Sequence, residues 1–280
     1  MVDLLAVRRA YAVEIRAIAQ LRDDALVEAF ARVPREHFLG PGPWQIAAGQ
    51  LQYETTADSD PRHVYRNVLI AIDATRSLNN GLPSALATWI ECLGLSPGDS
   101  VVHVGCGTGY YTAILAEIVG PMGHVVAVEI DPDLAQRARV NLTYLPQVDV
   151  RAGDGSRIDP GAADAVFVNA GATHAQPIWL DCLRIDGRLL LPVTVAAGHG
   201  GMFLITRQSD GFAATCVSPV AIFSCVGARD PDLERELAGK RGSESRVRSL
   251  RRDVHERDDT CWLHTPDTCL STLALDSAGG

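Results

Sequence analysis

A glycine-rich turn lies between two short runs of β-branched residues. Valine dominates residues 101–104 and 125–128, and the second run ends in Glu129, twenty residues after the last glycine of the turn. The glycines of this G-x-G-x-G pattern are Gly105, Gly107 and Gly109. Closely spaced glycines before a helix allow backbone N–H groups to approach a ligand, and an acid ending the next strand can accept ribose hydroxyls. The pattern therefore predicts a strand, turn, helix and strand that bind a nucleoside-containing cofactor.

The spacing of the glycines narrows the choice of cofactor. Turns that bind a dinucleotide favour G-x-G-x-x-G, in which the third glycine lets the helix pack closely while the pyrophosphate sits at its N-terminus. Here the third glycine comes one residue earlier, and the bulky Tyr110 and Tyr111 follow at once. This favours a cofactor without a pyrophosphate. The segment resembles the first motif of class I methyltransferases, which implies S-adenosylmethionine.

Apolar runs alternate with helical patterns through the middle of the chain. Strands are expected at residues 100–104, 124–129, 146–151, 164–169 and 187–193, and helices at residues 110–119, 132–143 and 176–184. This alternation predicts a mainly parallel sheet with right-handed crossovers, whose ligands bind at the carboxyl ends of the strands. After Pro192 the pattern changes to antiparallel strands. We expect an α/β, Rossmann-like class I methyltransferase fold with a mainly parallel seven-stranded sheet flanked by helices.

The two ends of the chain differ from this middle part. Residues 1–62 carry helical periodicity without strands, residues 63–222 form the predicted cofactor-binding core, and residues 223–280 form a charged extension. The charges of the extension have mixed signs, which favours a solvated helix and hairpin over a binding surface.

The overall composition excludes several classes of protein. The formal net charge of −9 argues against a general nucleic-acid surface, although a local basic patch stays open. The N-terminal residues lack the layout of a signal peptide, and the longest apolar stretch, residues 189–206, is broken by glycines and a proline. We therefore expect a cytoplasmic protein that makes no membrane contact.

Seven cysteines occur without a C-x-x-C pair, which favours buried thiols in a reducing compartment. Four residues of the extension offer metal-ligand chemistry: His255, Cys261, His264 and Cys269. Their spacing matches no usual zinc-binding pattern, so the sequence predicts no metal site.

Several motifs in order resemble one family of methyltransferases. Residues 33–38 (Val-Pro-Arg-Glu-His-Phe) resemble the entry motif of the protein-L-isoaspartate O-methyltransferases, and residues 101–112 resemble their first cofactor motif. Further segments follow in the same order, at residues 153–155, 164–168 and 183–193. The resemblance spans roughly residues 22–195.

This resemblance implies roles for particular residues. The backbone around Gly105 and Gly107 would meet the methionine part of the cofactor, Glu129 the ribose hydroxyls, and Asp154 the adenine amino group. The full predicted cofactor set is Gly105, Cys106, Gly107, Thr108, Gly109, Tyr110, Glu129, Ile130, Asp154, Gly155 and Asn169. Two alternatives stay open, because Asp154 is also a typical turn residue and Glu129 a typical neighbour of a helix N-cap.

The acceptor side departs from the family pattern. Members of the family carry a Thr-Ile-Ser-Gln-Pro-like segment that contacts the substrate, whereas the corresponding residues 76–83 here read Arg-Ser-Leu-Asn-Asn-Gly-Leu-Pro. His103 also stands where many relatives have an acid. Asn79 and Asn80 are the candidate acceptor contacts, followed by Asn169 and His174. Each of these is equally compatible with a loop-capping role.

The expected reaction is transfer of a methyl group to a carboxyl group of a protein, a peptide or a small acid. The sulfonium supplies an activated methyl group, and an ionised carboxylate needs no catalytic base. No clear base occurs near the strand ends. Two alternatives remain, a tRNA adenine methyltransferase and a non-catalytic protein that binds S-adenosylmethionine. The sequence leaves the acceptor and the oligomeric state open.

Overall fold

The computed structural model describes residues 3–48 and 52–275. The chain forms two compact units. Unit 1 contains Met1–Gly98 and Cys106–Ala152, and unit 2 contains Asp99–Gly105 and Gly153–Gly280. These units divide the chain at other places than the boundaries expected after residues 62 and 222.

The helices of unit 1 begin where the sequence offers capping residues. They are α1 (Leu4–Ala19), α2 (Asp24–Arg32), α3 (Pro83–Cys92), α4 (Tyr110–Val119) and α5 (Pro132–Asn141), with the short 3-10 helices η1 (Arg35–Phe38) and η2 (Pro61–Val64). The side chains of Asp3, Asp23 and Asp131 accept hydrogen bonds from the first N–H groups of α1, α2 and α5. The predicted helix over residues 110–119 is confirmed.

Unit 1 also contains strands that pair locally. They are β1 (Gln45–Ala48), β2 (Gln52–Thr55), β3 (Ala71–Asp73), β4 (Leu78–Asn79), β6 (His124–Glu129) and β7 (Val148–Ala152). The β6–β7 pair is parallel, as expected. The antiparallel β1–β2 pair contradicts the expectation of a strand-free N-terminal segment. Its residues are at most half-buried, so the sequence shows little of the apolar alternation that indicates a strand. The backbone pairing between the two strands defines their conformation instead.

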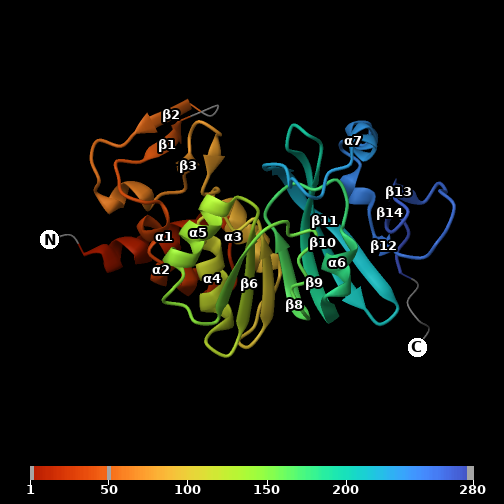
Figure 1. Cartoon of the computed structure of the whole chain (residues 1–280), viewed down its shortest axis with the longest axis horizontal. Coiled ribbons are helices and arrows are strands. Elements are labelled where there is room, and N and C mark those ends of the chain that lie inside the picture. Colours follow the sequence, from red (N-terminus) through yellow and green to blue (C-terminus); the bar gives the residue numbers. More distant parts are fainter. Residues whose placement is uncertain (1–2, 49–51, 276–280) are drawn as a thin grey trace. The chain divides into compact units, whose positions relative to one another are not determined.

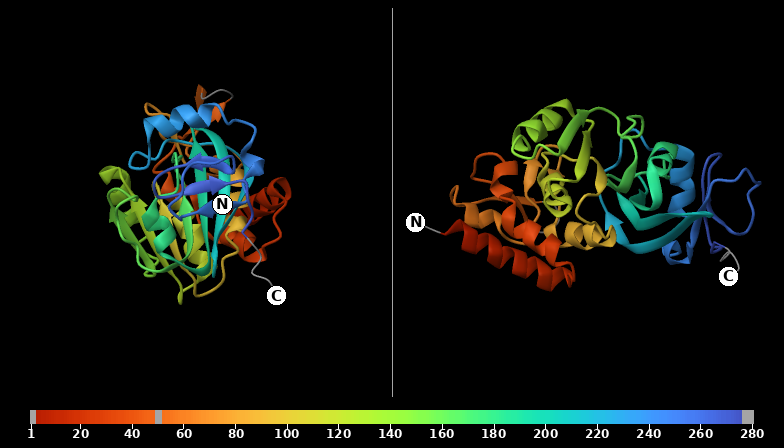
Figure 2. Two further views of the ribbon diagram at one scale, coloured as in Figure 1. Left: turned by 90° about the vertical axis from the view of Figure 1, so that its right-hand side faces the viewer. Right: turned by 90° about the horizontal axis from the view of Figure 1, so that it is seen from below.

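Unit 2 is built on one mixed sheet, visible from several sides in Figures 1 and 2. The strands, in spatial order, are β13 (Cys261–His264), β14 (Cys269–Ser271), β12 (Ser249–Arg251), β11 (Gly211–Ala221), β10 (His199–Gln208), β9 (Leu183–Thr194), β8 (Ala163–Val168) and β5 (Ser100–Val104). The pairs β5–β8 and β8–β9 are parallel, and every other neighbouring pair in this order is antiparallel. The change of direction after β9 confirms the switch expected beyond Pro192.

The α/β fold class is confirmed, with a sheet larger than seven strands. Unit 2 alone supplies eight strands within the described residues, because the C-terminal extension adds β12, β13 and β14 to the sheet. The extension also contains the expected helix, α7 (Pro231–Ala238), besides η3 (Glu244–Arg246). The core of the unit includes the fully buried Trp179 and Phe203, and α6 (Pro177–Asp181) carries the former.

Within the described ranges, no helix has both the length and the apolar character required to cross a bilayer.

Candidate active site

The glycine turn adopts a backbone path that requires glycine. The φ angles are +78° at Gly105, +57° at Gly107 and +95° at Gly109, a region in which other residues are strained. Within unit 1, the N–H group of Gly107 donates a hydrogen bond of 2.7 Å to Oε2 of Glu129. The turn and the acid at the end of β6 are therefore joined directly, as the sequence predicted that they would be neighbours.

Helix α5 and the residue after it support this turn from behind. A Cβ atom at Gly109 would stand 2.7 Å from Cδ1 of Leu142, so a larger residue would displace this leucine side chain. The side chain of Asn141 donates a hydrogen bond of 2.9 Å to the carbonyl oxygen of Thr108. These contacts fix the position of the turn.

Glu129 keeps hydrogen-bonding capacity for a ligand. Its Oε1 accepts from the N–H group of Asp131 at 3.1 Å, and its Oε2 accepts from Gly107. Each carboxylate oxygen has two lone pairs, so one remains on each oxygen for the two hydroxyls of a ribose. The carboxylate is only 7% exposed, which makes such donors favourable partners.

An ion pair connects the predicted acceptor segment to Asp131, whose N–H group binds Glu129. Arg76 binds Asp131 at 2.6 Å, and this hydrogen bond lowers the pKa of the Asp131 carboxyl. Asp131 also caps α5 and donates its N–H group to Glu129. The sequence analysis assigned no role to Arg76, because its partner lies 55 residues further along the chain.

The side chains of the turn mostly face the protein interior. Burial raises the pKa of the Cys106 thiol well above its usual range, which excludes it as a nucleophile. The ring of Tyr110 packs against Phe38 and Phe30, and the Thr108 hydroxyl is buried without a partner among the described residues. The turn can therefore offer a cofactor its backbone groups. Ile130, by contrast, is 43% exposed directly after β6.

The two candidate asparagines of the acceptor segment have different surroundings. Asn79 is half-buried, and its Oδ1 accepts a hydrogen bond of 2.8 Å from the Tyr53 hydroxyl. Its Nδ2 donates to the carbonyl oxygen of Ser77, which leaves one amide proton for another acceptor. Asn80 is 6% exposed, and its Oδ1 accepts from Nε of Arg35.

Arg35 holds the segment between residues 64 and 81. Its guanidinium is fully buried and donates hydrogen bonds to Asn80 and to four backbone carbonyl oxygens. These belong to Val64, Arg66, Val68 and Gly81. The sequence analysis included Arg35 in the entry motif but assigned it no role, because arginine is seldom fully buried and a single sequence gives no sign of it.

In unit 2, Asp154 closes its own turn. Its Oδ1 accepts hydrogen bonds from the N–H group and the hydroxyl of Ser156, at 2.9 and 2.7 Å. A Cβ atom at Gly227 would stand 2.0 Å from the same oxygen, so the chain passes directly over this carboxylate. The turn-residue interpretation accounts for these contacts, and the adenine contact stays a prediction. At Gly155, the carbonyl oxygen accepts from Nε1 of Trp179 at 2.8 Å.

The end of β8 lies beside the end of β5 in the same unit. The N–H group of Asn169 donates to the carbonyl oxygen of Val104 at 2.8 Å, and a Cβ atom at Gly105 would stand 3.4 Å from the carbonyl oxygen of Asn169. His174 has both ring nitrogens engaged at 3.0 Å, by Thr173 and Gln176. Burial lowers the pKa of His174, so its neutral form is favoured.

His103 has a structural position on β5. Its ring is fully buried and stacks on Phe167 with centroids 5.1 Å apart. Burial lowers its pKa to about 3, so the side chain is neutral near pH 7. An acid at the same place would need charged or polar donors, and the change to histidine fits the apolar surroundings.

The chain is similar to known proteins over most of its length. Residues 10–229 match the family model described as protein-L-isoaspartate(D-aspartate) O-methyltransferase. The protein-L-isoaspartate O-methyltransferase of Ignicoccus hospitalis is 33% identical over 211 residues, which cover 74% of this chain and 90% of that protein. Protein-L-isoaspartate O-methyltransferase 1 of Anaeromyxobacter sp. is 33% identical over 221 residues, which cover 76% and 94%.

Solved structures show the same fold. A protein-L-isoaspartate O-methyltransferase structure has a TM-score of 0.60 at 22% identity, over 84% of this chain and 69% of that one. The Plasmodium falciparum β-aspartate methyltransferase, solved with S-adenosyl-L-homocysteine, has a TM-score of 0.63 at 17% identity, over 79% and 98%.

The fold and the matches define an S-adenosylmethionine-dependent methyltransferase. The predicted cofactor is thus confirmed, while the contact of Glu129 with its ribose stays a prediction. The chain belongs to the protein-L-isoaspartate O-methyltransferase family.

Proposed function

We propose that this enzyme methylates a carboxyl group of a protein or peptide, with an isoaspartyl side chain as the acceptor. The observation that carries the proposal is the family match over residues 10–229, together with the Gly107 and Glu129 arrangement that suits the methyl donor. The relatives named above are isoaspartate O-methyltransferases, which supports a carboxylate acceptor.

The reaction needs little more than alignment of two groups. A carboxylate oxygen attacks the methyl carbon of the sulfonium, the carbon–oxygen bond forms as the carbon–sulfur bond breaks, and S-adenosyl-L-homocysteine leaves. The acceptor is already ionised near pH 7, so no proton has to be removed. The protein contributes by holding the carboxylate in line with the methyl group.

Asn79 is the proposed acceptor contact. The Tyr53 hydroxyl donates to its Oδ1, which orients the amide nitrogen as a donor, and one of its two protons remains for a carboxylate. Asn80 is proposed as a positioning residue, because its Oδ1 binds the buried Arg35 that holds residues 64–81. The two asparagines predicted together thus take separate proposed roles.

A pair of peptides tests the proposed acceptor. The full chain would be incubated with S-adenosylmethionine labelled in its methyl group and, in separate reactions, with tRNA and with each of two peptides that differ only in an isoaspartyl or an aspartyl linkage. We expect a base-labile methyl ester on the isoaspartyl peptide alone. Label on tRNA instead would overturn the proposal in favour of the adenine methyltransferase alternative. Cofactor binding without transfer to either peptide or to tRNA would support the non-catalytic one.

The Asn79→Ala variant tests the proposed contact. We expect kcat/KM for the isoaspartyl peptide to fall about tenfold, the effect of one lost hydrogen bond, with an S-adenosylmethionine Kd within about twofold of the parent value. Gln52→Ala, which removes an exposed carboxamide beside Tyr53, is the matched control and should leave both values unchanged. An unaltered kcat/KM in Asn79→Ala would remove this residue from the acceptor site.

A further inference from the structure

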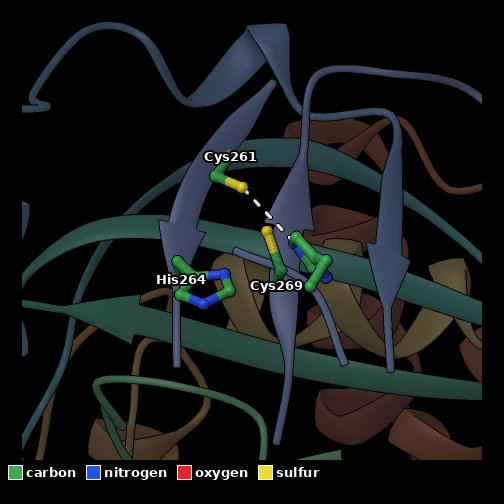
Figure 3. A group of neighbouring side chains, drawn as sticks. Cys261, His264 and Cys269 are labelled. Carbon is green, nitrogen blue, oxygen red and sulfur yellow. Dashed lines mark hydrogen bonds between the residues drawn. The ribbon is translucent and has the colours of Figure 1, made fainter. Parts of the chain in front are cut away.

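The C-terminal extension gathers four side chains of the types that bind transition metals. His255, Cys261, His264 and Cys269 each offer one ligand atom, and these atoms all lie within 4.8 Å of one another. Figure 3 shows Cys261, His264 and Cys269 pointing toward one another from the two strands of the β13–β14 hairpin. The sequence analysis dismissed this set on its spacing, whereas the fold brings its members together.

A local irregularity in β13 places two of these residues on one face. Side chains three positions apart on a regular strand point to opposite faces. The register of β13 against β14 shifts between Cys261 and Leu263, which restores Cys261 to the face of His264. His264 is directly opposite Cys269 on β14, so these two side chains are cross-strand neighbours.

The distances and the donor chemistry suit a tetrahedral ion. Nε2 of His255 lies 3.4 Å from Sγ of Cys261. With zinc–sulfur bonds of about 2.3 Å and zinc–nitrogen bonds of about 2.0 Å, neighbouring ligand atoms of a tetrahedron are roughly 3.3–3.8 Å apart. Nδ1 of His264 is buried and has no hydrogen-bond partner in the described part of the chain. Such an atom is costly unless a ligand satisfies it.

Neighbouring groups orient these ligands in the manner of metal sites. Nδ1 of His255 lies 2.9 Å from the carbonyl oxygen of Asp253, a contact that places the proton on Nδ1 and leaves Nε2 free to coordinate. The Asp253 carboxylate lies 3.3 Å from the same nitrogen and binds Arg251. The N–H group of Asp258 donates to Sγ of Cys261 at 3.4 Å, which would stabilise a thiolate there.

We propose that His255, Cys261, His264 and Cys269 bind one Zn²⁺ ion as a structural site. Two thiolates and two imidazoles are a donor set typical of zinc, and four protein ligands leave no open position for a substrate. Both thiols lose their protons on binding, so the ion's charge is balanced by two thiolates and two protons are released. The carboxylate of Asp258, 3.4 Å from Sγ of Cys261, then retains Thr260 and Arg251 as partners.

The ion would fasten the edge of the sheet in unit 2. Strands β12, β13 and β14 are only three or four residues long, so their ladders supply few hydrogen bonds. Trp262 lies between two of the ligands in the sequence. Its ring packs against that of Phe203 in the core of the unit, with ring centroids 5.5 Å apart. A metal site at this hairpin would therefore hold the extension against the methyltransferase sheet.

Metal analysis of the full chain tests the proposal. The protein would be purified without chelators, loaded with Zn²⁺, freed of excess by gel filtration, and measured by inductively coupled plasma mass spectrometry. We expect roughly one zinc ion per chain, and at least a tenfold loss in Cys261→Ser and in Cys269→Ser. Cys216→Ser, which alters a half-buried thiol on β11, is the matched control and should retain the ion. Equal zinc content in all four proteins would overturn the assignment.

Cobalt substitution keeps the proposal falsifiable if the cysteine variants do not fold. The unmodified chain, reduced and loaded with Co²⁺, should show the intense visible bands of a tetrahedral ion and thiolate-to-metal charge transfer in the near ultraviolet. Removal of Zn²⁺ with a chelator should also lower the melting temperature of the unmodified chain. Weak, octahedral-type bands, or a reduced chain that takes up neither ion, would contradict the site. A Cys261–Cys269 disulfide that forms in place of metal binding would do so as well.

Discussion

Two segments of unit 1 have well-defined conformations for opposite reasons. The turn at residues 106–109 depends on glycines, on backbone hydrogen bonds and on Glu129. The segment at residues 64–81 has little regular structure and is held by one buried side chain, that of Arg35. The first is specified locally, while the second depends on a residue about 30 to 45 positions earlier in the chain. The cofactor turn therefore depends on a few glycines of its own. The predicted acceptor segment depends instead on one arginine from another part of the chain.

Removal of the Arg35 guanidinium gives the largest expected effect. In Arg35→Met, the carbonyl oxygens that it binds would be buried without donors, so we expect the free energy of unfolding to fall by about 3–5 kcal/mol. Urea denaturation measures this change. Arg32→Met, which alters an exposed arginine, is the control and should change it by less than about 1 kcal/mol. Similar losses in both variants would show that residues 64–81 do not depend on Arg35.

Substitution of Glu129 comes next and acts on the turn. In Glu129→Ala, the ribose loses both proposed acceptor oxygens, so we expect the Kd for S-adenosylmethionine to rise about 100-fold, which is about 2.7 kcal/mol. Isothermal titration calorimetry measures it. Glu54→Ala removes the same charge from an exposed position on β2 and should leave the Kd unchanged. An unchanged Kd in Glu129→Ala would mean that the ribose binds elsewhere.

Strand β5, which precedes the turn, contains His103. Protonation of this residue gives the smallest expected effect, a dependence of stability on pH. The pKa of His103 is lowered from 6.5 to about 3, so between these values the unfolded chain binds a proton that the folded chain does not. The contribution of neutral His103 to the free energy of unfolding is therefore fully present above pH 6.5. It falls as the pH drops, by about 2 kcal/mol at pH 5.

The variant His103→Leu isolates this contribution. Unfolding free energies measured between pH 7 and pH 5 should fall less steeply in His103→Leu than in the parent chain. His124→Leu, which changes an exposed histidine at the start of β6, should keep the parent slope. If both variants keep the parent slope, protonation of His103 does not cause the pH dependence of the unfolding free energy.

The sequence predicted most of the elements that position the cofactor. Strand β5, helix α4 and strand β6 begin and end near the expected residues, because their apolar patterns and capping residues are local. The sequence analysis wrongly expected no strands in the N-terminal segment, because the half-exposed residues of the β1–β2 hairpin lack a clear period. The sequence marked the divergent segment as the candidate acceptor site, which stays a prediction, and only the fold distinguishes its two asparagines, because Arg35 binds Asn80.

The C-terminal extension shows the same limit. The spacing of the four residues in the sequence argued against a metal site. The β-bulge and the cross-strand pair that bring them together cannot be predicted from the intervals between the ligands. Asp154 is a related case, since only the fold shows Gly227 lying against its carboxylate.

By itself, the sequence determined the class of fold, the methyl donor and the glycine turn with its acid. These follow from hydrophobic period and from backbone conformations that few residues adopt. The tertiary structure alone decided that Arg35 is buried, that Arg76 reaches Asp131, and that two histidines and two cysteines meet at one hairpin. Such contacts join residues distant along the chain or depend on a register shift, and neither leaves a periodic trace in the sequence.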